Sequence, residues 1–158
     1  MTAARAQVAV GAEPEGVRMI EHTADFGLEV EAPTLEALFA RAAAGLFSSF
    51  AEASGDEPEP PTATPNDRDV PVELRGENVE ELMVLWLDEL LYRAEEKRLI
   101  FTSFEVESVD PTRLTGRAYG RPAAKGETFE PPVKGVTHHD LWIRRENGGW
   151  RAHVIIDV

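Results

Sequence analysis

Apolar and polar residues alternate over residues 26–32, which is typical of a strand with one buried face. Apolar side chains occupy every second position there, and the positions between them hold glycine or glutamate. From Leu35 onward, apolar residues instead recur as they do on the buried side of a helix, and Thr34 is a suitable N-cap. The pattern predicts a half-buried strand over residues 26–32 and a helix over residues 35–52.

A second helical pattern begins at Asn78, which forms a capping-box sequence with Glu81. Its apolar residues, from Val79 to Leu91, cover one side of the helix, and we interpret them as a core face. One further strand pattern, over residues 68–77, lies between the two predicted helices. Four more follow the second helix, over residues 99–109, 113–120, 133–145 and 150–158. The sequence ENGG between the last two predicts a hairpin turn.

The order of these elements predicts the fold class. Strands are followed by a helix, a strand, a second helix and a run of strands, which is not the strict alternation of a doubly wound fold. We therefore predict an α+β fold with two helices packed on mainly antiparallel sheet. Residues 1–16 lack periodicity and are interpreted as a disordered tail before a single domain over residues 17–158. The proline-rich segments 54–67 and 121–132 are expected to be solvated loops.

Composition limits the function further. A chain of 158 residues with 42% hydrophobic residues can bury one core, and its formal net charge of -13 repels nucleic-acid phosphates. Direct nucleic-acid binding is therefore not expected. The absence of cysteine excludes disulfides and thiolate metal sites. The sequence contains no stretch with the length and apolar character of a signal peptide or a membrane span, so we expect a cytoplasmic location.

The histidines do not indicate a zinc enzyme. None of the four has the spacing of a zinc motif: they are His22, His138, His139 and His153. The run from His138 to Asp140 lies on a predicted strand, where side chains alternate between faces, so we do not expect the three to converge. The sequence also lacks the usual glycine-rich phosphate loops and the serine-hydrolase nucleophile motif.

Carboxylates are the remaining candidates for chemistry. Asp157 adjoins Val158, whose α-carboxylate is charged at neutral pH. If the last strand docks beside the turn that contains Asp25, three carboxylates meet, an arrangement suited to calcium or magnesium. The alternative is that Asp25 accepts hydrogen bonds from nearby backbone amides in a turn, and that Asp157 is a solvated chain end. Spacing alone leaves both open.

Several segments together resemble the archease family, from about Val17 to the last residue. They are HTADFGLEVEAPTLEALFARAAAGLF, LDELLY, VKGVT and the closing VIIDV. The resemblance implies a compact domain in which one strand-helix-strand-strand unit is inserted in another. It also implies a protein that is not an enzyme itself but a cofactor of an RNA ligase of the RtcB type. That ligase joins ends bearing a 2′,3′-cyclic phosphate or 3′-phosphate to a 5′-hydroxyl in tRNA splicing and RNA repair. Archease promotes its guanylylation and multiple turnover.

The resemblance also implies roles for individual residues. The family's divalent metal site, expected to hold calcium, carries over to Asp25, Asp157 and Val158. His22 is then expected to orient the turn through a hydrogen bond. Lys134, in the V-K-x-x-T stretch, either contacts the ligase or is a solvated strand lysine.

Two other classes of function stay open from the sequence. The chain could be a metal-dependent hydrolase that uses Asp25, Asp157 and a bound water. It could also be a chaperone-like interaction module in which metal is incidental. Phosphatase and nuclease assays on the isolated protein separate the first class from a ligase cofactor, and ligase turnover with and without chelator separates the second.

Overall fold

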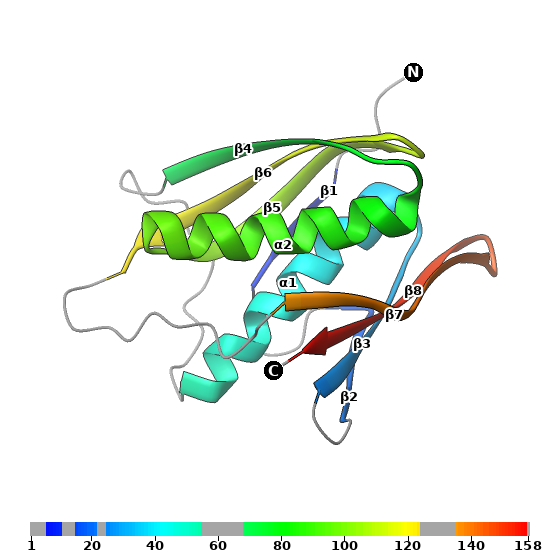
Figure 1. Cartoon of the computed structure of the whole chain (residues 1–158), viewed down its shortest axis with the longest axis horizontal. Coiled ribbons are helices and arrows are strands. Elements are labelled where there is room, and N and C mark those ends of the chain that lie inside the picture. The colour runs from blue at the N-terminus through cyan, green and yellow to red at the C-terminus, as the bar shows by residue number, and fades with distance from the viewer. Residues whose placement is uncertain (1–5, 11–14, 22–24, 55–67, 124–134, 158) are drawn as a thin grey trace.

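The residues that the computed structural model describes form two four-stranded sheets and two helices (Figure 1). The described residues are 6–10, 15–21, 25–54, 68–123 and 135–157. The first sheet has the strand order β1 (Ala6–Ala9), β5 (Leu99–Asp110), β6 (Arg113–Pro122), β4 (Arg68–Arg75). The second has the order β2 (Val17–Glu21), β3 (Asp25–Ala32), β8 (Gly149–Asp157), β7 (Gly135–Glu146). Every paired strand is antiparallel to its neighbour, so the predicted α+β class is confirmed.

Two strand-helix-strand-strand units make up most of this fold. We call β4, α2 (Val79–Lys97), β5 and β6 the inner unit, and β3, α1 (Leu35–Ser54), β7 and β8 the outer unit. The inner unit is inserted between α1 and β7 of the outer one. In each unit the first strand pairs with the last, and the last pairs with the remaining one. The nested arrangement implied by the family resemblance is therefore present.

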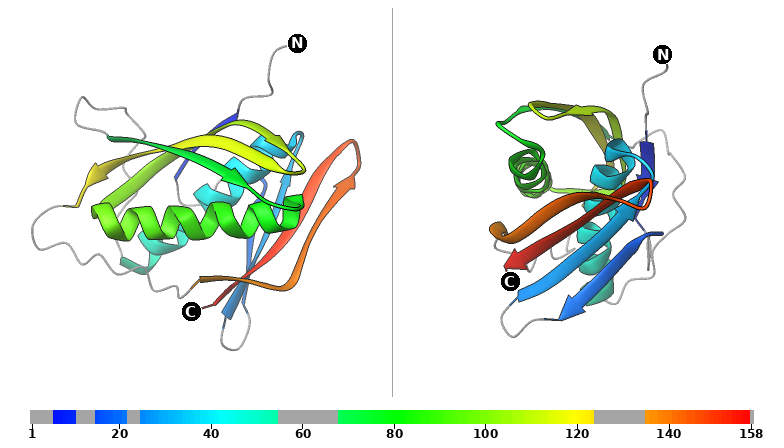
Figure 2. Two further views of the ribbon diagram at one scale, coloured as in Figure 1. Left: turned by 45° about the horizontal axis from the view of Figure 1, so that its top comes forward. Right: turned by 90° about the vertical axis from the view of Figure 1, so that its right-hand side faces the viewer.

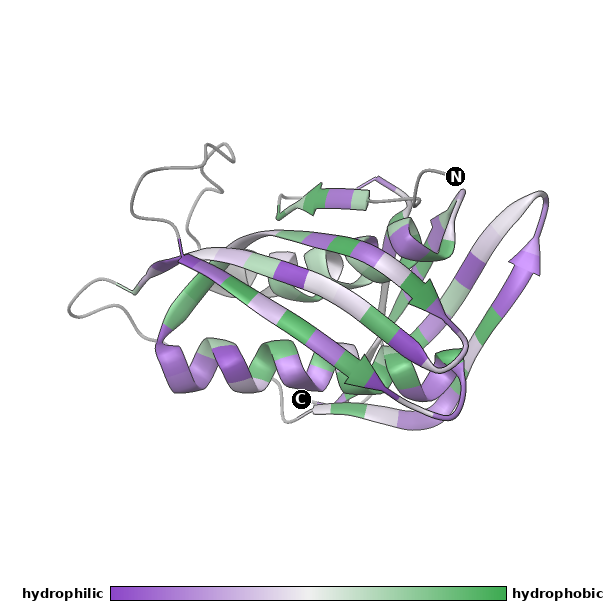
Figure 3. Cartoon of the chain, turned by 90° about the horizontal axis from the view of Figure 1, so that it is seen from above, coloured by the Kyte–Doolittle hydropathy of each residue, from purple (hydrophilic) through white to green (hydrophobic). Residues whose placement is uncertain are grey.

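The two helices lie between the sheets (Figure 2). Both helices contact strands of both sheets: α1 packs on β5 and β3, and α2 packs on β4, β5 and β7. Hydrophobic and hydrophilic residues alternate along the strands of the first sheet, as Figure 3 shows, so that one face meets the helices and the other meets solvent. None of the helices among the described residues is long and apolar enough to cross a membrane.

Local sequence signals explain where the helices begin and end. The Thr34 hydroxyl accepts a hydrogen bond from the Ala37 N–H at 3.1 Å, and Asn78 Oδ1 accepts one from the Glu81 N–H at 2.8 Å. Both caps satisfy N–H groups that have no partner within the helix, as predicted. Helix α2 ends at Lys97, and the following C-cap residue, Arg98, adopts a left-handed conformation with φ of 51°.

A buried contact between the helices anchors the core. The indole Nε1–H of Trp86 in α2 donates to the backbone oxygen of Phe39 in α1 at 2.9 Å, and both side chains are fully buried. The Trp86 ring meets Phe104 of β5 edge to face, with centroids 6.5 Å apart. The apolar side of α2 is therefore core, as its periodicity predicted.

The prediction of a disordered tail over residues 1–16 was wrong for Ala6–Ala9. These residues form β1, which pairs with the edge of β5. Val8 and Val10 pack against the core, and the Val10 N–H donates to the Thr102 carbonyl at 2.8 Å. Four residues carry too little periodicity to reveal a strand, and this one depends on docking to an existing sheet edge. Most of the predicted loops at 54–67 and 121–132 lie outside the described residues.

Candidate metal centre

Strand β8 is central in the second sheet and ends beside the start of β3. Its residues Ala152, Val154 and Ile156 are fully buried, which fixes the strand's register against the helices. In that register Asp157 lies directly opposite Asp25 of β3. Directly paired residues in an antiparallel sheet have Cα atoms about 4.5–5.5 Å apart. The expected docking of the last strand beside Asp25 is therefore confirmed for the backbone.

The donor chemistry of these positions fits a hard cation. Asp25 and Asp157 each offer carboxylate oxygens, and Asp157 is exposed, so a cation can reach it. Among the described side chains, no group of three histidine, aspartate or glutamate residues is arranged to hold a metal. The side chain of Asp25 lies outside that description, as do His22, Lys134 and Val158. Metal binding by Asp25, Asp157 and Val158 stays a prediction.

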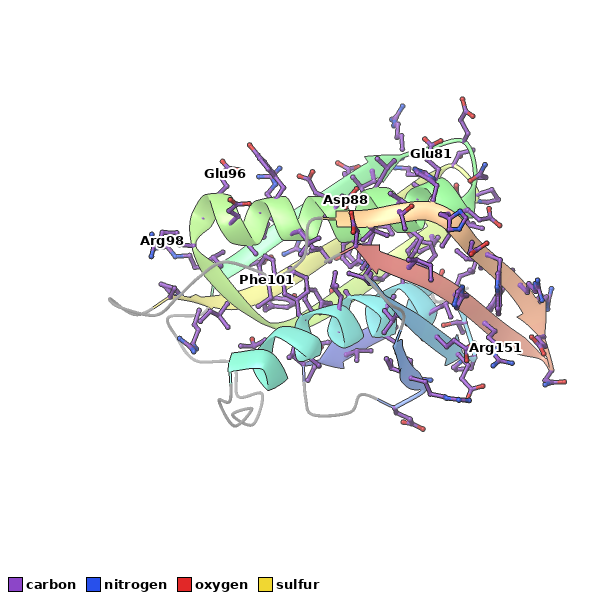
Figure 4. All side chains as sticks on the ribbon, turned by 60° about the horizontal axis from the view of Figure 1, so that its bottom comes forward. Glu81, Asp88, Glu96, Arg98, Phe101 and Arg151 are labelled. Atoms are coloured by element: carbon purple, nitrogen blue, oxygen red, sulfur yellow. The ribbon has the colours of Figure 1, made fainter. Side chains whose placement is uncertain are left out.

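Asp88 of α2 also reaches this end of the sheet, where Figure 4 shows it between its helix and β7. Its Oδ1 accepts a hydrogen bond from the Val136 N–H at 3.2 Å. The preceding residue, Gly135, pairs with Asp157 on the other side. Asp88 is exposed as a residue, but partial desolvation of its carboxyl raises the pKa, although the Val136 hydrogen bond and the charge of His138 act to lower it.

Sequence reasoning missed the contact of Asp88 with Val136 because periodicity places Asp88 on the solvated side of α2. The contact joins residues 48 positions apart. Such a contact leaves no local pattern. The available signal was its place in LDELLY, one of the segments that carry the family resemblance.

Two residues of the run from His138 to Asp140 are in contact in the structure. A bulge interrupts the pairing of β7 with β8 between Thr137 and Trp142, and Asp140 has a positive φ of 55°. His139 Nε2 lies 3.2 Å from Asp140 Oδ2. This contact joins two of the three residues and does not contradict the expectation that all three do not converge. Both side chains are largely exposed, so this is a surface pair.

The fourth histidine lies within an aromatic group on the same hairpin. The ring of His153 stacks on Trp142, with centroids 5.8 Å apart. The guanidinium of Arg144 lies 4.2 Å from the centre of the Trp142 ring, within the range of a cation–π contact. His153 Nδ1 also lies 3.0 Å from the backbone oxygen of Asp140. Stacking and hydrogen bonding therefore explain the position of the His153 ring.

The fold and the site together define a small acidic α+β domain of two nested units, with an aspartate pair where β3 begins and β8 ends. The profile of the archease protein family (MTH1598/TM1083) matches residues 18–158. The chain is 34% identical to "Protein archease" of Methanopyrus kandleri over 88% of this chain and 96% of that protein. It is 33% identical to "Protein archease" of Archaeoglobus fulgidus over 89% and 98%, respectively. This chain belongs to the archease family.

A solved structure supports the same assignment at the level of the fold. The solution structure of Methanobacterium thermoautotrophicum protein 1598 matches with a TM-score of 0.69 and 31% sequence identity. The match covers 90% of this chain and 99% of that one. The family resemblance carried by the H-T-A-D opening and the closing VIIDV is thus confirmed.

Proposed function

We propose that this protein is a cofactor of an RNA ligase of the RtcB type, which joins 2′,3′-cyclic phosphate or 3′-phosphate ends to 5′-hydroxyl ends. It promotes guanylylation and repeated turnover of the ligase and does not perform ligation itself. A divalent cation, calcium in this proposal, is held by Asp25, Asp157 and the α-carboxylate of Val158. The observation that carries the proposal is the register that sets Asp25 opposite Asp157 in a chain of the archease family.

The chain's own residues prepare this site by bringing like charges together. Two aspartates held on adjacent strands repel each other, and the repulsion is relieved when a cation binds between them. When bound, the cation supplies positive charge that holds the end of β8 in one place. The buried residue Ile156 fixes the backbone directly before Asp157, so the carboxylate of Asp157 is attached to a rigid part of the strand.

Charge supports docking to a ligase. A ligase that binds RNA needs a basic surface for phosphates, and a protein of net charge -13 is attracted to such a surface. Complementary charge accelerates and orients association more than it increases affinity. The association is therefore expected to slow markedly as salt is raised.

A ligation time course under multiple-turnover conditions tests this proposal. The purified cognate ligase is mixed with excess RNA, with and without this protein, and each reaction is repeated with chelator. We expect product to exceed one equivalent of ligase when the protein and calcium are both present. Equal turnover with and without the protein contradicts the cofactor role, and equal stimulation in chelator contradicts the metal requirement. Phosphatase or nuclease activity of the isolated protein would instead favour a hydrolase.

A further inference from the structure

The first three residues of β7 form a short, separate piece of edge strand. Gly135, Val136 and Thr137 pair with the end of β8, and the bulge then interrupts pairing until Trp142. β7 lies at the edge of its sheet, so this piece has a strand neighbour on one side. A three-residue piece with one neighbour is marginal by itself and needs another attachment to stay ordered.

Asp88 supplies that attachment from a fixed position. Trp86, Leu87 and Leu90 on the same turns of α2 are fully buried, so the helix backbone that carries Asp88 cannot shift without disturbing the core. The hydrogen bond from the Val136 N–H to Asp88 Oδ1 satisfies a backbone donor of the edge strand. A helix of the inner unit therefore holds a strand of the outer unit.

This attachment lies next to the candidate metal centre. A Cβ added to Gly135 would lie 3.7 Å from Asp88 Oδ1, so Asp88 approaches the residue that pairs with Asp157. Across the end of the sheet the order is thus Asp88, Gly135, Asp157 and Asp25. If the start of β7 detached, the end of β8 would lose one of its two strand neighbours and would fray.

We propose that Asp88 is a positioning residue of the metal centre: its hydrogen bond with the Val136 N–H fixes the start of β7, which holds Asp157 in register opposite Asp25. The inference rests on the proposed metal site and adds a residue outside the proposed ligands. Metal ligands must be held within about 0.5 Å of their working geometry, so fraying at this strand end lowers affinity even though every ligand is retained. Loss of such supporting contacts typically reduces metal affinity about 10–100-fold.

Two substitutions separate the hydrogen bond from the charge. Asp88→Ala removes the acceptor and the charge together. Asp88→Asn removes the charge but keeps an amide oxygen that can accept from the Val136 N–H. Glu95→Ala is the matched control, because it removes an exposed carboxylate from the same helix.

Calcium affinity, measured by calorimetry on the full chain, is the main readout. We expect Asp88→Ala to weaken calcium binding about 10-fold, Asp88→Asn to stay within about 3-fold of wild type, and Glu95→Ala to be unchanged. Amide hydrogen exchange in chelator is the second readout, and we expect faster exchange at Val136 in Asp88→Ala but not in Asp88→Asn. A general loss of stability would instead accelerate exchange throughout the core.

The outcomes distinguish this inference from the proposed function. If wild type binds calcium and Asp88→Ala binds it equally well, Asp88 is not a positioning residue, and the proposed metal site stands. If Asp88→Asn loses as much affinity as Asp88→Ala, Asp88 acts through its charge, and the inference is overturned. If wild type itself binds no calcium, the proposed metal site fails and the inference fails with it.

Discussion

The inner and outer units have the same strand connections but different chemistry at corresponding strand ends. In the outer unit the start of β3 meets the end of β8, and Asp25 faces Asp157. In the inner unit the start of β4 meets the end of β6, and Arg68 faces Gly120. The same topology thus places two acids opposite each other in the outer unit, and an arginine opposite a glycine in the inner unit.

The outer surfaces of the two units differ as well. Ion pairs cross the strands of the inner unit, including Arg117 with Asp69 at 2.6 Å and Arg113 with Glu73 at 2.5 Å. The outer unit has cross-strand ion pairs too, such as Arg151 with Glu29 at 3.1 Å, but it also carries the stack of Trp142 on His153. Backbone topology therefore fixes where strand ends meet, and the residues placed there decide whether a site results. Substitutions in the two units should consequently change different properties.

The largest expected effect belongs to the core of the inner unit. Trp86→Ala should lower the free energy of unfolding by about 3–5 kcal/mol, because it leaves a cavity and removes the hydrogen bond to Phe39. Denaturant unfolding in chelator measures this loss. Trp86→Phe is the control and should cost less, since most of the ring volume remains. A loss below about 1 kcal/mol for Trp86→Ala would show that this contact does not anchor the units.

The next effect belongs to the aspartate pair of the outer unit. Asp25→Asn and Asp157→Asn should each weaken calcium binding, because each removes the charge of a metal ligand. Loss of a residue that only hydrogen-bonds to a ligand typically costs about 10–100-fold in affinity, so we expect at least that loss here. Stimulation of the ligase should fall in parallel, while thermal stability in chelator should not fall, since a repulsion is relieved. Wild-type stimulation by a folded Asp25→Asn protein would remove Asp25 from the site.

A smaller effect is expected from a short polar tag fused after Val158. The fusion converts the α-carboxylate to an amide carbonyl, which still coordinates calcium but without charge. Calcium affinity should weaken without disappearing. The same tag placed before Met1 is the matched control and should have no effect on calorimetry or ligase turnover. Equal calcium affinity of the two tagged proteins would show that the terminal carboxylate is not a ligand of consequence.

The smallest effect is expected at the surface of the inner unit. Arg117→Met removes the contacts of Arg117 with Asp69 and Glu107, which are exposed pairs. Exposed ion pairs typically contribute about 0–1 kcal/mol, so unfolding free energy should change by less than that and calcium affinity should not change. The difference from wild type should shrink further in high salt. A measurable change in calcium affinity would show that the two units are coupled through this face.

Sequence patterns predicted the elements whose periodicity is strong. The strand that contains Leu28 and Val30, and the helix that contains Trp86 and Leu90, repeat apolar residues over enough positions to define a buried side. The pattern of β1 is too short, and the bulge after Thr137 interrupts a segment that was predicted as one continuous strand. The residues left the meeting of Asp25 and Asp157 as one of two alternatives, and the family resemblance favoured it. The contact of Asp88 with Val136 could be found only from the structure, because neither local sequence contains a pattern that indicates it.

The pairing of β3 with β8 has a consequence for how the chain is made. Synthesis proceeds from the N-terminus, so β3 is complete long before β8 exists to pair with it. Strands β4, β5 and β6 follow closely with α2 and can associate while synthesis continues. The second sheet must wait, and contacts between distant residues form slowly even in a finished chain. A ribosome that stalls before β8 would therefore release a product with the first sheet formed and the backbone edge of β3 unpaired, where chaperones and proteases can bind it.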